Sequence, residues 1–429
     1  MSFLEELKWR GLLYQTTGEQ ELAAHLATPH RVGYCGFDPT ADSLHAGNFI
    51  AIKLLMEFQR AGHKPVVLCG GGTGLIGDPS GKDTERTLKS RDEVAANVEA
   101  QRKIFARFLD FSPTSKTGAV LVNNLDWLGE LGYLEVLRTI GKHFSINAMI
   151  QRDSVRTRLE SREQGISYTE FSYMLLQAYD FLHLHKTLGC TVQMAGSDQY
   201  GNIVAGIDLI RREAQGGTRE GFGVTAPLLT RADGKKFGKS EKGAIWLSAD
   251  KTSPYAFYQF WINVDDADVG ALLRWFTFLS EPEVLSIVEA HDREPHKREA
   301  QRRLAHEMTV LVHGNDELKQ AELATEALFQ GDVRALDERL LDEVLADVPS
   351  TEHGRSQLDG EGVALLDVLA QTTLVSSKRE ARQFLESGAV SVNGQKALLT
   401  RKLTSADLVH GKAILLKRGK KNWHLTRWR

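Results

Sequence analysis

The sequence predicts an α/β protein of several domains: a parallel β-sheet covered by helices, then an α-helical domain and a small α+β domain. Three observations lead to this prediction. With 429 residues, the chain is too long for one ordinary hydrophobic core. Short apolar runs alternate with helical patterns up to about residue 225, which is typical of βαβ units. Beyond a Gly- and Lys-rich loop, the pattern turns helical and then ends in short strands among basic residues.

The predicted first domain, 1–225, contains four apolar, β-rich runs separated by helical patterns. The expected strands are 31–37, 64–70, 119–123 and 190–195, and the expected helices are 47–61, 91–110, 130–149 and 168–187. Parallel sheets of this kind bind ligands at the carboxyl ends of their strands. We therefore expect the segments 34–40 and 70–82 to line a site.

The rest of the chain divides by composition. The expected parts are a mobile lysine-containing loop at 226–250, a helical domain at 251–328, an acidic linker at 329–362 and a C-terminal domain at 363–429. In the last domain we expect a helix at 377–386 and strands at 389–392 and 413–417. Asn393 and Gly394 form a turn signal between two apolar runs.

Composition narrows the class of protein. The hydrophobic share of 42% and the charged share of 25% are those of a globular protein. The three cysteines, Cys35, Cys69 and Cys190, form no Cys-x-x-Cys pair, which disfavours a disulfide framework or a zinc ribbon. The N-terminus lacks the apolar core of a signal peptide, and no run has the roughly 18 apolar residues of a membrane span. We expect a cytoplasmic protein that does not enter the membrane.

The net charge of −3 is unevenly distributed along the chain. Residues 363–429 hold 13 Lys and Arg against four Asp and Glu, a net charge of +9, and the other residues carry −12. A basic domain on an acidic body indicates that only this part faces a polyanion such as RNA. A merely solvated basic tail is the alternative.

Two motifs far apart in the chain point to nucleotide chemistry. His45-Ala46-Gly47-Asn48 opens the helix after the first strand, where backbone N–H groups can bind phosphate. Lys236 and Lys239 lie in the later Gly- and Lys-rich loop, from which they can close over phosphates. Alone, the first motif is more often a helix cap and the second more often solvated charge. Together, and in this order, they indicate ATP-dependent adenylation.

The Gly-rich segment after the second strand fits neither common nucleotide motif. Gly72, Gly74 and Gly77 have dinucleotide-site spacing, but Asp78-Pro79 would break the helix that such a site needs. A P-loop is disfavoured too, because its spacing is one residue short and Asp83 stands where it requires Ser or Thr. A Gly-rich loop that approaches a ligand, with Asp78 facing a cationic group, suits an amino-acid substrate better.

A polar stripe marks the helix expected at 168–187. Tyr173, Gln177 and Asp180 share one face of an otherwise apolar helix, which indicates a buried polar pocket rather than an amphipathic surface helix. Asp198, after the strand at 190–195, lies where it can hold ribose hydroxyls or simply stabilise a turn.

These motifs, taken in order with Tyr34 to Thr40, resemble the bacterial-type tyrosyl-tRNA synthetases, which are class I aminoacyl-tRNA synthetases. The resemblance covers nearly the whole chain, and its specificity lies in the combination. It implies a Rossmann-like catalytic domain, an α-helical anticodon-side domain and a C-terminal RNA-binding domain. It also implies a homodimer whose interface is an insertion at about 121–165.

The resemblance implies a role for each matching residue. Tyrosine would be bound by Tyr34, Asp78, Tyr173, Gln177, Asp180 and Gln193. The catalytic groups at the phosphates would be Thr40, His45, Asn48, Lys82, Arg86, Lys236 and Lys239. The ATP and adenylate site would include Cys35, Gly36, Asp38, Gly47, Gly196, Asp198, Gln199 and Lys239. RNA would be bound by Lys378, Arg379, Arg382, Lys420 and Lys421, with Trp423 and Trp428 either stacking on bases or belonging to the core.

The implied substrates are L-tyrosine, ATP with accompanying Mg²⁺, and a tyrosine-specific tRNA, with no dedicated metal site and no tightly bound cofactor. The chain departs from the family pattern at Asn48, where His is usual, and at Phe237 and Gly238, where Met and Ser are usual in class I signatures. A tryptophan-specific synthetase is the closest alternative, and Tyr34 with Asp180 favours tyrosine. A non-catalytic RNA-binding protein, a nicotinamide-dependent oxidoreductase and a degenerate synthetase-like regulator each explain fewer of these motifs.

Overall fold

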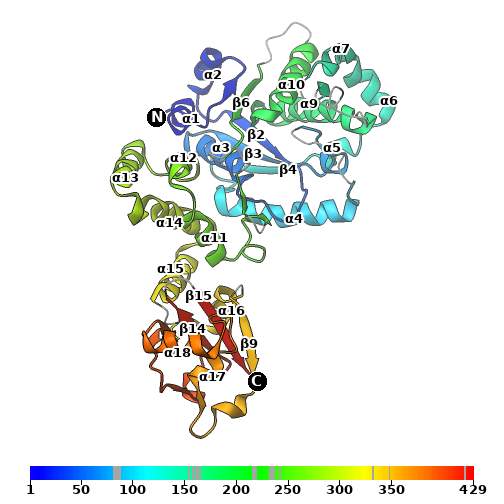
Figure 1. The fold of residues 1–429 in the computed structure, drawn as a ribbon. Helices are drawn as coiled ribbons and strands as arrows, with labels where there is room; N and C mark the ends of the chain where they lie inside the picture. The colour runs from blue at the N-terminus through cyan, green and yellow to red at the C-terminus, as the bar shows by residue number, and fades with distance from the viewer. Residues whose placement is uncertain are drawn as a thin grey trace. The chain divides into compact units, whose positions relative to one another are not determined.

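The structure is a computed structural model that describes residues 1–80, 88–152, 155–156, 159, 166–214, 220–230, 237–240, 243–330, 333–346, 348–419 and 422–429. Its contacts divide the chain into two compact units, Met1–Val312 and His313–Arg429 (Figure 1). Among the described residues, no helix combines the length and the apolar character needed to cross a membrane.

A six-stranded sheet forms the centre of the N-terminal unit, in the order β1-β6-β5-β2-β3-β4 (Figure 1). Its strands are β1 (Gln15–Thr16), β2 (Val32–Phe37), β3 (Lys64–Cys69), β4 (Val120–Asn123), β5 (Cys190–Gly196) and β6 (Phe222–Ala226). Strands β2 to β6 run parallel, and β1 pairs antiparallel with β6 at one edge. The predicted parallel sheet and its four predicted strands are confirmed. The sequence analysis misses β1 and β6. Strand β1 has only two residues, too few to show a periodicity, and β6 is a single run of five residues.

Helices cover both faces of this sheet. Helix α3 (Phe49–Arg60) packs on β2 and β3 and contacts α4 (Arg91–Phe108), which lies beneath the sheet in Figure 1. Helices α9 (Tyr168–Leu188) and α10 (Tyr200–Glu213) lie on the other side of the sheet. Two short helices, α1 (Phe3–Arg10) and α2 (Glu19–Leu26), precede β2. The predicted helices at 47–61, 91–110 and 168–187 are confirmed to within a few residues.

The single helix predicted at 130–149 is wrong. This stretch is broken into α6 (Tyr133–Glu135), a π-helix (Val136–Ile140), a 3₁₀ turn (Gly141–His143) and α7 (Ile146–Ile150). Gly141 ends the π-helix, and Phe144 has an extended backbone. Glycine is a poor helix former, so the apolar periodicity here does not make one continuous helix.

Helix α9 begins and ends at clear sequence signals. The Oγ of Ser167 accepts a hydrogen bond from the backbone N of Glu170 at 3.3 Å, which caps the first turn. At the other end, Gly189 takes the left-handed conformation, with a φ of 65°. The helix is therefore fixed in register, and its polar residues Tyr173 and Asp180 are buried.

The N-terminal unit continues into the predicted helical segment. Its helices are α11 (Pro254–Ile262), α12 (Asp266–Phe276), α13 (Glu281–Arg293) and α14 (Glu299–His313). The end of α12 is tied to α3 by a buried lysine: Lys53 Nζ donates to the Thr277 carbonyl at 2.8 Å and pairs with Glu57 at 2.6 Å. A buried charge needs such partners, so this contact fixes the helical segment against α3.

The C-terminal unit contains a five-stranded sheet in the order β12-β11-β14-β15-β9. The strands are β9 (Ser350–His353), β11 (Val390–Val392), β12 (Gln395–Lys396), β14 (Ala413–Arg418) and β15 (Asn422–Trp428). The helices of this unit are α15 (Asn315–Gln330), α16 (Glu338–Val344), α17 (Leu365–Leu369) and α18 (Lys378–Glu386). A two-stranded sheet joins β10 (Val363–Ala364) to β13 (Lys402–Leu403). The predicted helix at 377–386 and strands at 389–392 and 413–417 are confirmed. The Asn393-Gly394 turn is confirmed as well, with φ angles of 46° and 86°.

The segment 329–362, expected as a linker, contains structure of its own. It holds α16 and also β9, which pairs in parallel with the last strand, β15. The linker prediction fails here because β9 is short and polar, and its partner lies about 75 residues further along the chain.

Candidate active site

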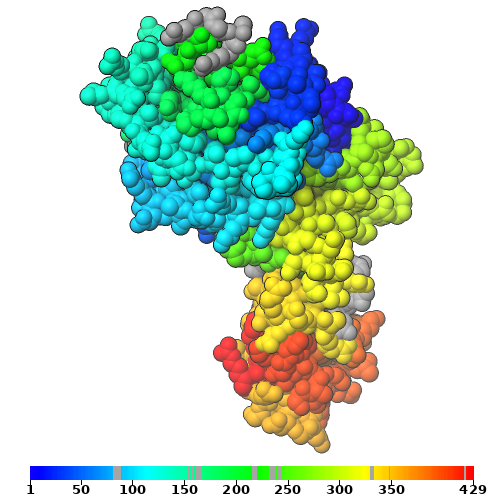
Figure 2. Space-filling view, turned by 180° about the vertical axis from the view of Figure 1, so that it is seen from behind, coloured from blue at the N-terminus to red at the C-terminus, as the bar shows by residue number. Residues whose placement is uncertain are grey.

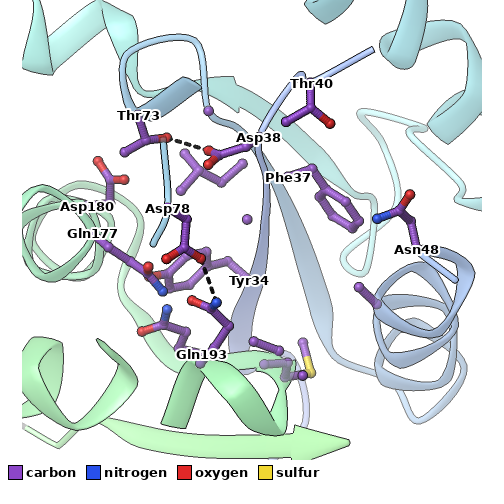
Figure 3. A pocket seen from close by; sticks show the side chains of 18 of the residues that line it. Tyr34, Phe37, Asp38, Thr40, Asn48, Thr73, Asp78, Gln177, Asp180 and Gln193 are labelled. Carbon is purple, nitrogen blue, oxygen red and sulfur yellow. Dashed lines mark hydrogen bonds between the residues drawn. The ribbon is translucent and has the colours of Figure 1, made fainter. Parts of the chain in front are cut away.

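A cavity of about 320 Å³ opens at the carboxyl ends of β2 and β5 (Figure 3). Thirteen of the predicted site residues line it: Tyr34, Gly36, Asp38, Thr40, His45, Asn48, Asp78, Tyr173, Gln177, Asp180, Gln193, Gly196 and Gln199. Figure 3 shows Asn48 at the N-terminus of α3 at one end, and Tyr34, Asp78, Gln177 and Asp180 gathered at the other. The cavity therefore lies where the sequence analysis expects a ligand site, at the carboxyl ends of parallel strands.

A buried carboxylate lies at the deep end of the cavity. Asp180 accepts hydrogen bonds from Asn124 Nδ2 at 2.9 Å and from Trp127 Nε1 at 2.8 Å. Trp127 belongs to the short helix α5 (Leu125–Leu128), which follows β4. Burial raises the pKa of Asp180 to about 7, against these two hydrogen bonds, which lower it.

Tyr34 lies close to this carboxylate and is 1% exposed. Burial, with the negative charge of Asp180 as the second cause, raises the pKa of the Tyr34 hydroxyl well above its usual value. That hydroxyl has no hydrogen-bond partner among the described residues. A buried hydroxyl without a partner is costly, so this end of the cavity suits a ligand that carries a hydroxyl group.

A second carboxylate, Asp78, lies near Tyr34 and Gln177 (Figure 3). It accepts from the backbone N of Ser80 at 2.9 Å and from Gln199 Nε2 at 2.7 Å. Burial raises its pKa to about 6. The buried amide oxygen of Gln193 has no partner among the described residues. Acceptors of this kind suit a cationic group.

Asp38, at the end of β2, joins the two halves of the cavity. It accepts from Thr73 Oγ1 at 2.7 Å and from Tyr173 Oη at 3.0 Å (Figure 3 shows the first bond). Gln177, on the same helix face as Tyr173, accepts from Asn202 Nδ2 at 3.0 Å. The polar stripe of α9 therefore faces a buried pocket, and the alternative of a surface helix is wrong.

The other end of the cavity is the N-terminus of α3. Asn48 makes no capping bond to the helix; instead its Oδ1 accepts from the backbone N of His45 at 3.1 Å, so its amide NH₂ remains the donor. His45 Nδ1 accepts from the backbone N of Gly47 at 3.0 Å, so the neutral ring carries its proton on Nε2. Two side-chain donors and the helix N-terminus make this end suited to phosphate.

Of the residues predicted for the catalytic and adenylate site whose side chains the structure describes, three do not line the cavity: Cys35, Gly47 and Asp198. Cys35 is buried on the opposite face of β2 from Tyr34, since neighbouring strand residues alternate, and burial raises the pKa of its thiol. Gly47 lies behind the His45 ring, and Asp198 is exposed beside Gln199. Lys239 lies in β7 (Lys239–Ser240), whereas Lys82, Arg86, Lys236, Lys420 and Lys421 fall outside the described residues.

The sequence analysis misses the two residues that hold Asp180. Asn124 and Trp127 come directly after β4, at the same edge of the sheet as the cavity. The sequence does carry a signal for them, since polar residues at the carboxyl end of a predicted strand are site candidates. Thr73, which also lines the cavity, belongs to the same class.

The C-terminal unit presents a basic helix. Lys378, Arg379 and Arg382 are exposed on α18, and Lys378 pairs with Asp367. Trp428 is 3% exposed and stacks on His353, so it belongs to the core and does not stack on RNA. Trp423 is half-buried, with Lys417 Nζ 4.2 Å from the centre of its ring.

Comparison with known proteins identifies the chain's family. Residues 27–330 match the family described as tRNA synthetases class I (W and Y), and residues 341–426 match the tyrosine–tRNA ligase SYY-like C-terminal domain. The chain is 49% identical to the tyrosine–tRNA ligase of Roseiflexus castenholzii, over 99% of both chains, and 48% identical to that of Geobacillus kaustophilus, over 100% of both. This chain belongs to the tyrosine–tRNA ligase family.

The solved structures agree with this membership. A C-terminally truncated mitochondrial tyrosyl-tRNA synthetase of Aspergillus nidulans is 33% identical, with a TM-score of 0.68, over 76% of this chain and 94% of that one. A tryptophanyl-tRNA synthetase of Encephalitozoon cuniculi, only 14% identical with a TM-score of 0.53, shares the fold alone. The full-length relatives are tyrosine–tRNA ligases, so the tryptophan and non-catalytic alternatives do not fit.

Proposed function

We propose that the protein activates L-tyrosine with ATP, releasing pyrophosphate, and then transfers tyrosine from the adenylate to the 3′ end of its tRNA. The observation that carries this proposal is a cavity that has both a hydroxyl-accepting end and a phosphate-binding end.

At the deep end, Tyr34 and Asp180 would bind the phenol hydroxyl of tyrosine. Phenylalanine lacks this hydroxyl and would leave both groups without their partner in a desolvated site. The handling of phenylalanine by this family is a known general example of such rejection, with a ratio of about 10⁵. The α-ammonium group would be held by Asp78, Tyr173 and Gln177, with Gln193 nearby.

At the other end, Thr40, His45 and Asn48 would contact the ATP phosphates. The tyrosine carboxylate is itself the nucleophile, so its attack on the α-phosphorus needs no general base. It does need alignment and neutralisation of the charge that builds up on the leaving pyrophosphate. Donors from His45 and Asn48 supply part of this, and we assign the rest to Lys82, Arg86, Lys236 and Lys239. Mg²⁺ would arrive with ATP as part of the substrate.

The adenylate would lie between the two ends. Asp38, Gly36 and Gly196 line this stretch of the cavity, and Gln199 adjoins it. The glycines leave room for close approach of the nucleotide. Asp198 and Gly47 are assigned supporting positions, since neither lines the cavity, and the structure gives Cys35 no contact with it.

The C-terminal unit is the proposed tRNA-binding part. The exposed side chains of Lys378, Arg379 and Arg382 share one short helix, and basic side chains at helical spacing suit the phosphates of RNA. We assign Lys420 and Lys421 to the same surface.

We further propose a cytoplasmic homodimer. Exposed apolar side chains gather in one stretch: Tyr133, Leu134, Leu137, Ile146, Ile150, Leu159 and Tyr168. Figure 2 shows this part of the chain, in teal, at the outer edge of the N-terminal unit. Apolar patches of this kind mark contact sites, and the segment coincides with the interface expected at 121–165. The free cysteines Cys35, Cys69 and Cys190 suit a reducing compartment.

A charged substitution in this segment should separate the dimer. Leu134 is 80% exposed in the single chain and would be covered in the dimer. A charged Glu in its place would have to leave water when the two chains associate, which is unfavourable. We expect the wild-type protein to have twice the mass of one 47.7 kDa chain in light scattering, and Leu134→Glu to shift toward one chain. Leu285→Glu, on exposed α13, is the matched control and should leave the mass unchanged. A wild-type mass of one chain would contradict the proposal.

The proposed reaction is tested by tyrosine-dependent ATP–pyrophosphate exchange. The purified protein is offered tyrosine, phenylalanine and tryptophan separately. We expect exchange with tyrosine and none above background with the other two, because only tyrosine pairs with Tyr34 and Asp180. Exchange driven by tryptophan would keep the chemistry and overturn the substrate, and no exchange with any amino acid would overturn the activation step.

A further inference from the structure

The segment that follows the second lysine motif lies directly against the first motif. His45 and Trp246 form an isolated antiparallel β-bridge. The backbone N of Ala46 donates to the Ile245 carbonyl at 2.8 Å, and that of Leu247 donates to the Leu44 carbonyl at 2.8 Å. The two segments, some 200 residues apart in the sequence, therefore share a fixed register in which position 246 is opposite His45.

Two glycines, Gly238 and Gly47, also lie close together where these segments meet. The backbone N of Ile245 donates to the Gly238 carbonyl at 3.1 Å, which draws the loop residue Gly238 toward α3. A Cβ on Gly238 would lie 2.8 Å from the backbone N of Gly47, and the φ of Gly238 is 88°. Only glycine permits this approach and this conformation. The departure from the usual Ser at this position is thereby explained.

Phe237, the other departure, anchors the loop base. Its ring packs on Phe260, Trp261 and Phe276 at centroid distances of 5.4 to 5.6 Å. Phe276 in turn stacks on Phe49, the first residue of α3, at 5.7 Å. The base of the second motif is thus packed on the same helix start that carries the first motif.

The side chain of Trp246 lies between a cation and the catalytic imidazole. Its ring meets the His45 ring edge-on, with the centroids 6.1 Å apart and the planes at 66°. Lys251 Nζ lies 5.0 Å from the centre of the Trp246 ring and pairs with Asp42 at 2.6 Å. The backbone N of Trp246 donates to Thr252 Oγ1 at 3.0 Å. The indole is therefore held by its backbone and by a cation on its ring.

We propose that Trp246 is a positioning residue for His45. The Gly47 N–H bond to His45 Nδ1 fixes which nitrogen carries the proton, and the ring contact with Trp246 bears on how the imidazole is oriented. The indole packs against the imidazole at an angle of 66° and so restrains its orientation at the edge of the cavity that His45 lines. This inference rests on the proposed role of His45 in ATP activation, which the design below tests separately.

The test is a graded series at Trp246 in two backgrounds, measured by tyrosine-dependent pyrophosphate exchange. A small misplacement of a catalytic group costs up to about 10²-fold, so we expect Trp246→Leu to lower kcat roughly 10- to 100-fold. The KM for tyrosine should stay unchanged, because the phenol end of the cavity is untouched. Trp246→Phe retains a ring and should recover most of the loss. In a His45→Ala background, neither substitution should lower the rate further.

Trp275→Leu is the matched control, since Trp275 is also half-buried in the same unit but its indole lies beside Gly11 rather than beside His45, and it should leave kcat unchanged. Equal losses from Trp246→Leu in both backgrounds would overturn the positioning role, as would equal losses from Leu and Phe. If Trp246→Leu fails to fold, as judged by thermal unfolding, the Trp246→Phe comparison in the two backgrounds decides by the same criterion. Wild-type exchange by His45→Ala alone would instead overturn the proposed role of His45.

Discussion

Asp180→Asn is expected to lower kcat/KM for tyrosine activation by at least about 10²-fold while the protein stays folded. The carboxylate has two acceptor oxygens, and each already receives a donor, from Asn124 at 2.9 Å and from Trp127 at 2.8 Å. The amide of Asn keeps one acceptor and turns an NH₂ group toward one of these donors. The pocket then loses the negative acceptor that the substrate hydroxyl needs. Pyrophosphate exchange over a range of tyrosine concentrations measures the effect.

Asp208→Asn is the matched control, because it makes the same Asp-to-Asn change at a partly exposed position of α10. The kcat/KM of this variant should stay within about 2-fold of wild type. Trp127→Phe removes one donor to Asp180 without changing the carboxylate, and it should give an intermediate loss. Normal kinetics in Asp180→Asn would remove Asp180 from the site.

The same substitution should change how stability depends on pH. In the folded protein burial raises the pKa of Asp180 to about 7, from 3.8 for an unperturbed Asp. Its stabilising contribution is therefore fully present below about pH 4 and is lost as the pH rises through about 7. Asn does not titrate, so the melting temperature of Asp180→Asn relative to wild type should rise between pH 5 and pH 8. A difference that is the same at both pH values would contradict the raised pKa.

The central sheet is predictable because its signals are local. Strands β2 to β5 are short apolar runs bounded by Gly, Pro or Asn, and the helices between them keep a regular apolar face. The signals fail where pairing is non-local or an element is very short. The two-residue β1 acquires its strand character only from β6, and β9 only from β15, which is the last strand of the chain. Local propensity carries no information on such pairs.

The site divides in the same way. Tyr34, Asp38 and His45 could be placed from the sequence because they lie in one predicted strand or in the segment after it. Asp180 could be placed because it shares a helix face with Tyr173. Asn124, which fixes Asp180 from a different strand end, has a function only through a contact across 56 residues. Neighbouring side chains of a strand point to opposite faces of the sheet. Because Tyr34 faces the cavity, Cys35 faces away from it and is not a site residue.

Removal of residues 314–429 is expected to leave tyrosine activation nearly intact and to abolish tRNA charging. The cut lies at Gly314, in the turn between α14 and α15, and it spares the unit Met1–Val312, which contains the whole cavity. Pyrophosphate exchange should therefore stay within about 3-fold of the full chain, since its substrates contact only that unit. The truncated form of the Aspergillus nidulans relative supports the choice of variant, because that protein was crystallised without its C-terminal part.

Charging should fall by at least about 10²-fold, because the truncation removes residues 363–429, which carry a net charge of +9. A full-length variant separates the effect of these charges from that of the whole unit: Lys378→Ala, Arg379→Ala and Arg382→Ala together. Each RNA phosphate that is no longer neutralised by a basic side chain lowers the salt dependence of binding by about one unit of slope. This variant should therefore bind tRNA more weakly and with a shallower dependence on salt, while its exchange activity should be that of wild type. Unimpaired charging by the truncated protein would refute an RNA-binding role for the C-terminal unit, whereas charging abolished in the truncation but retained in the triple variant would move the RNA-binding surface away from α18.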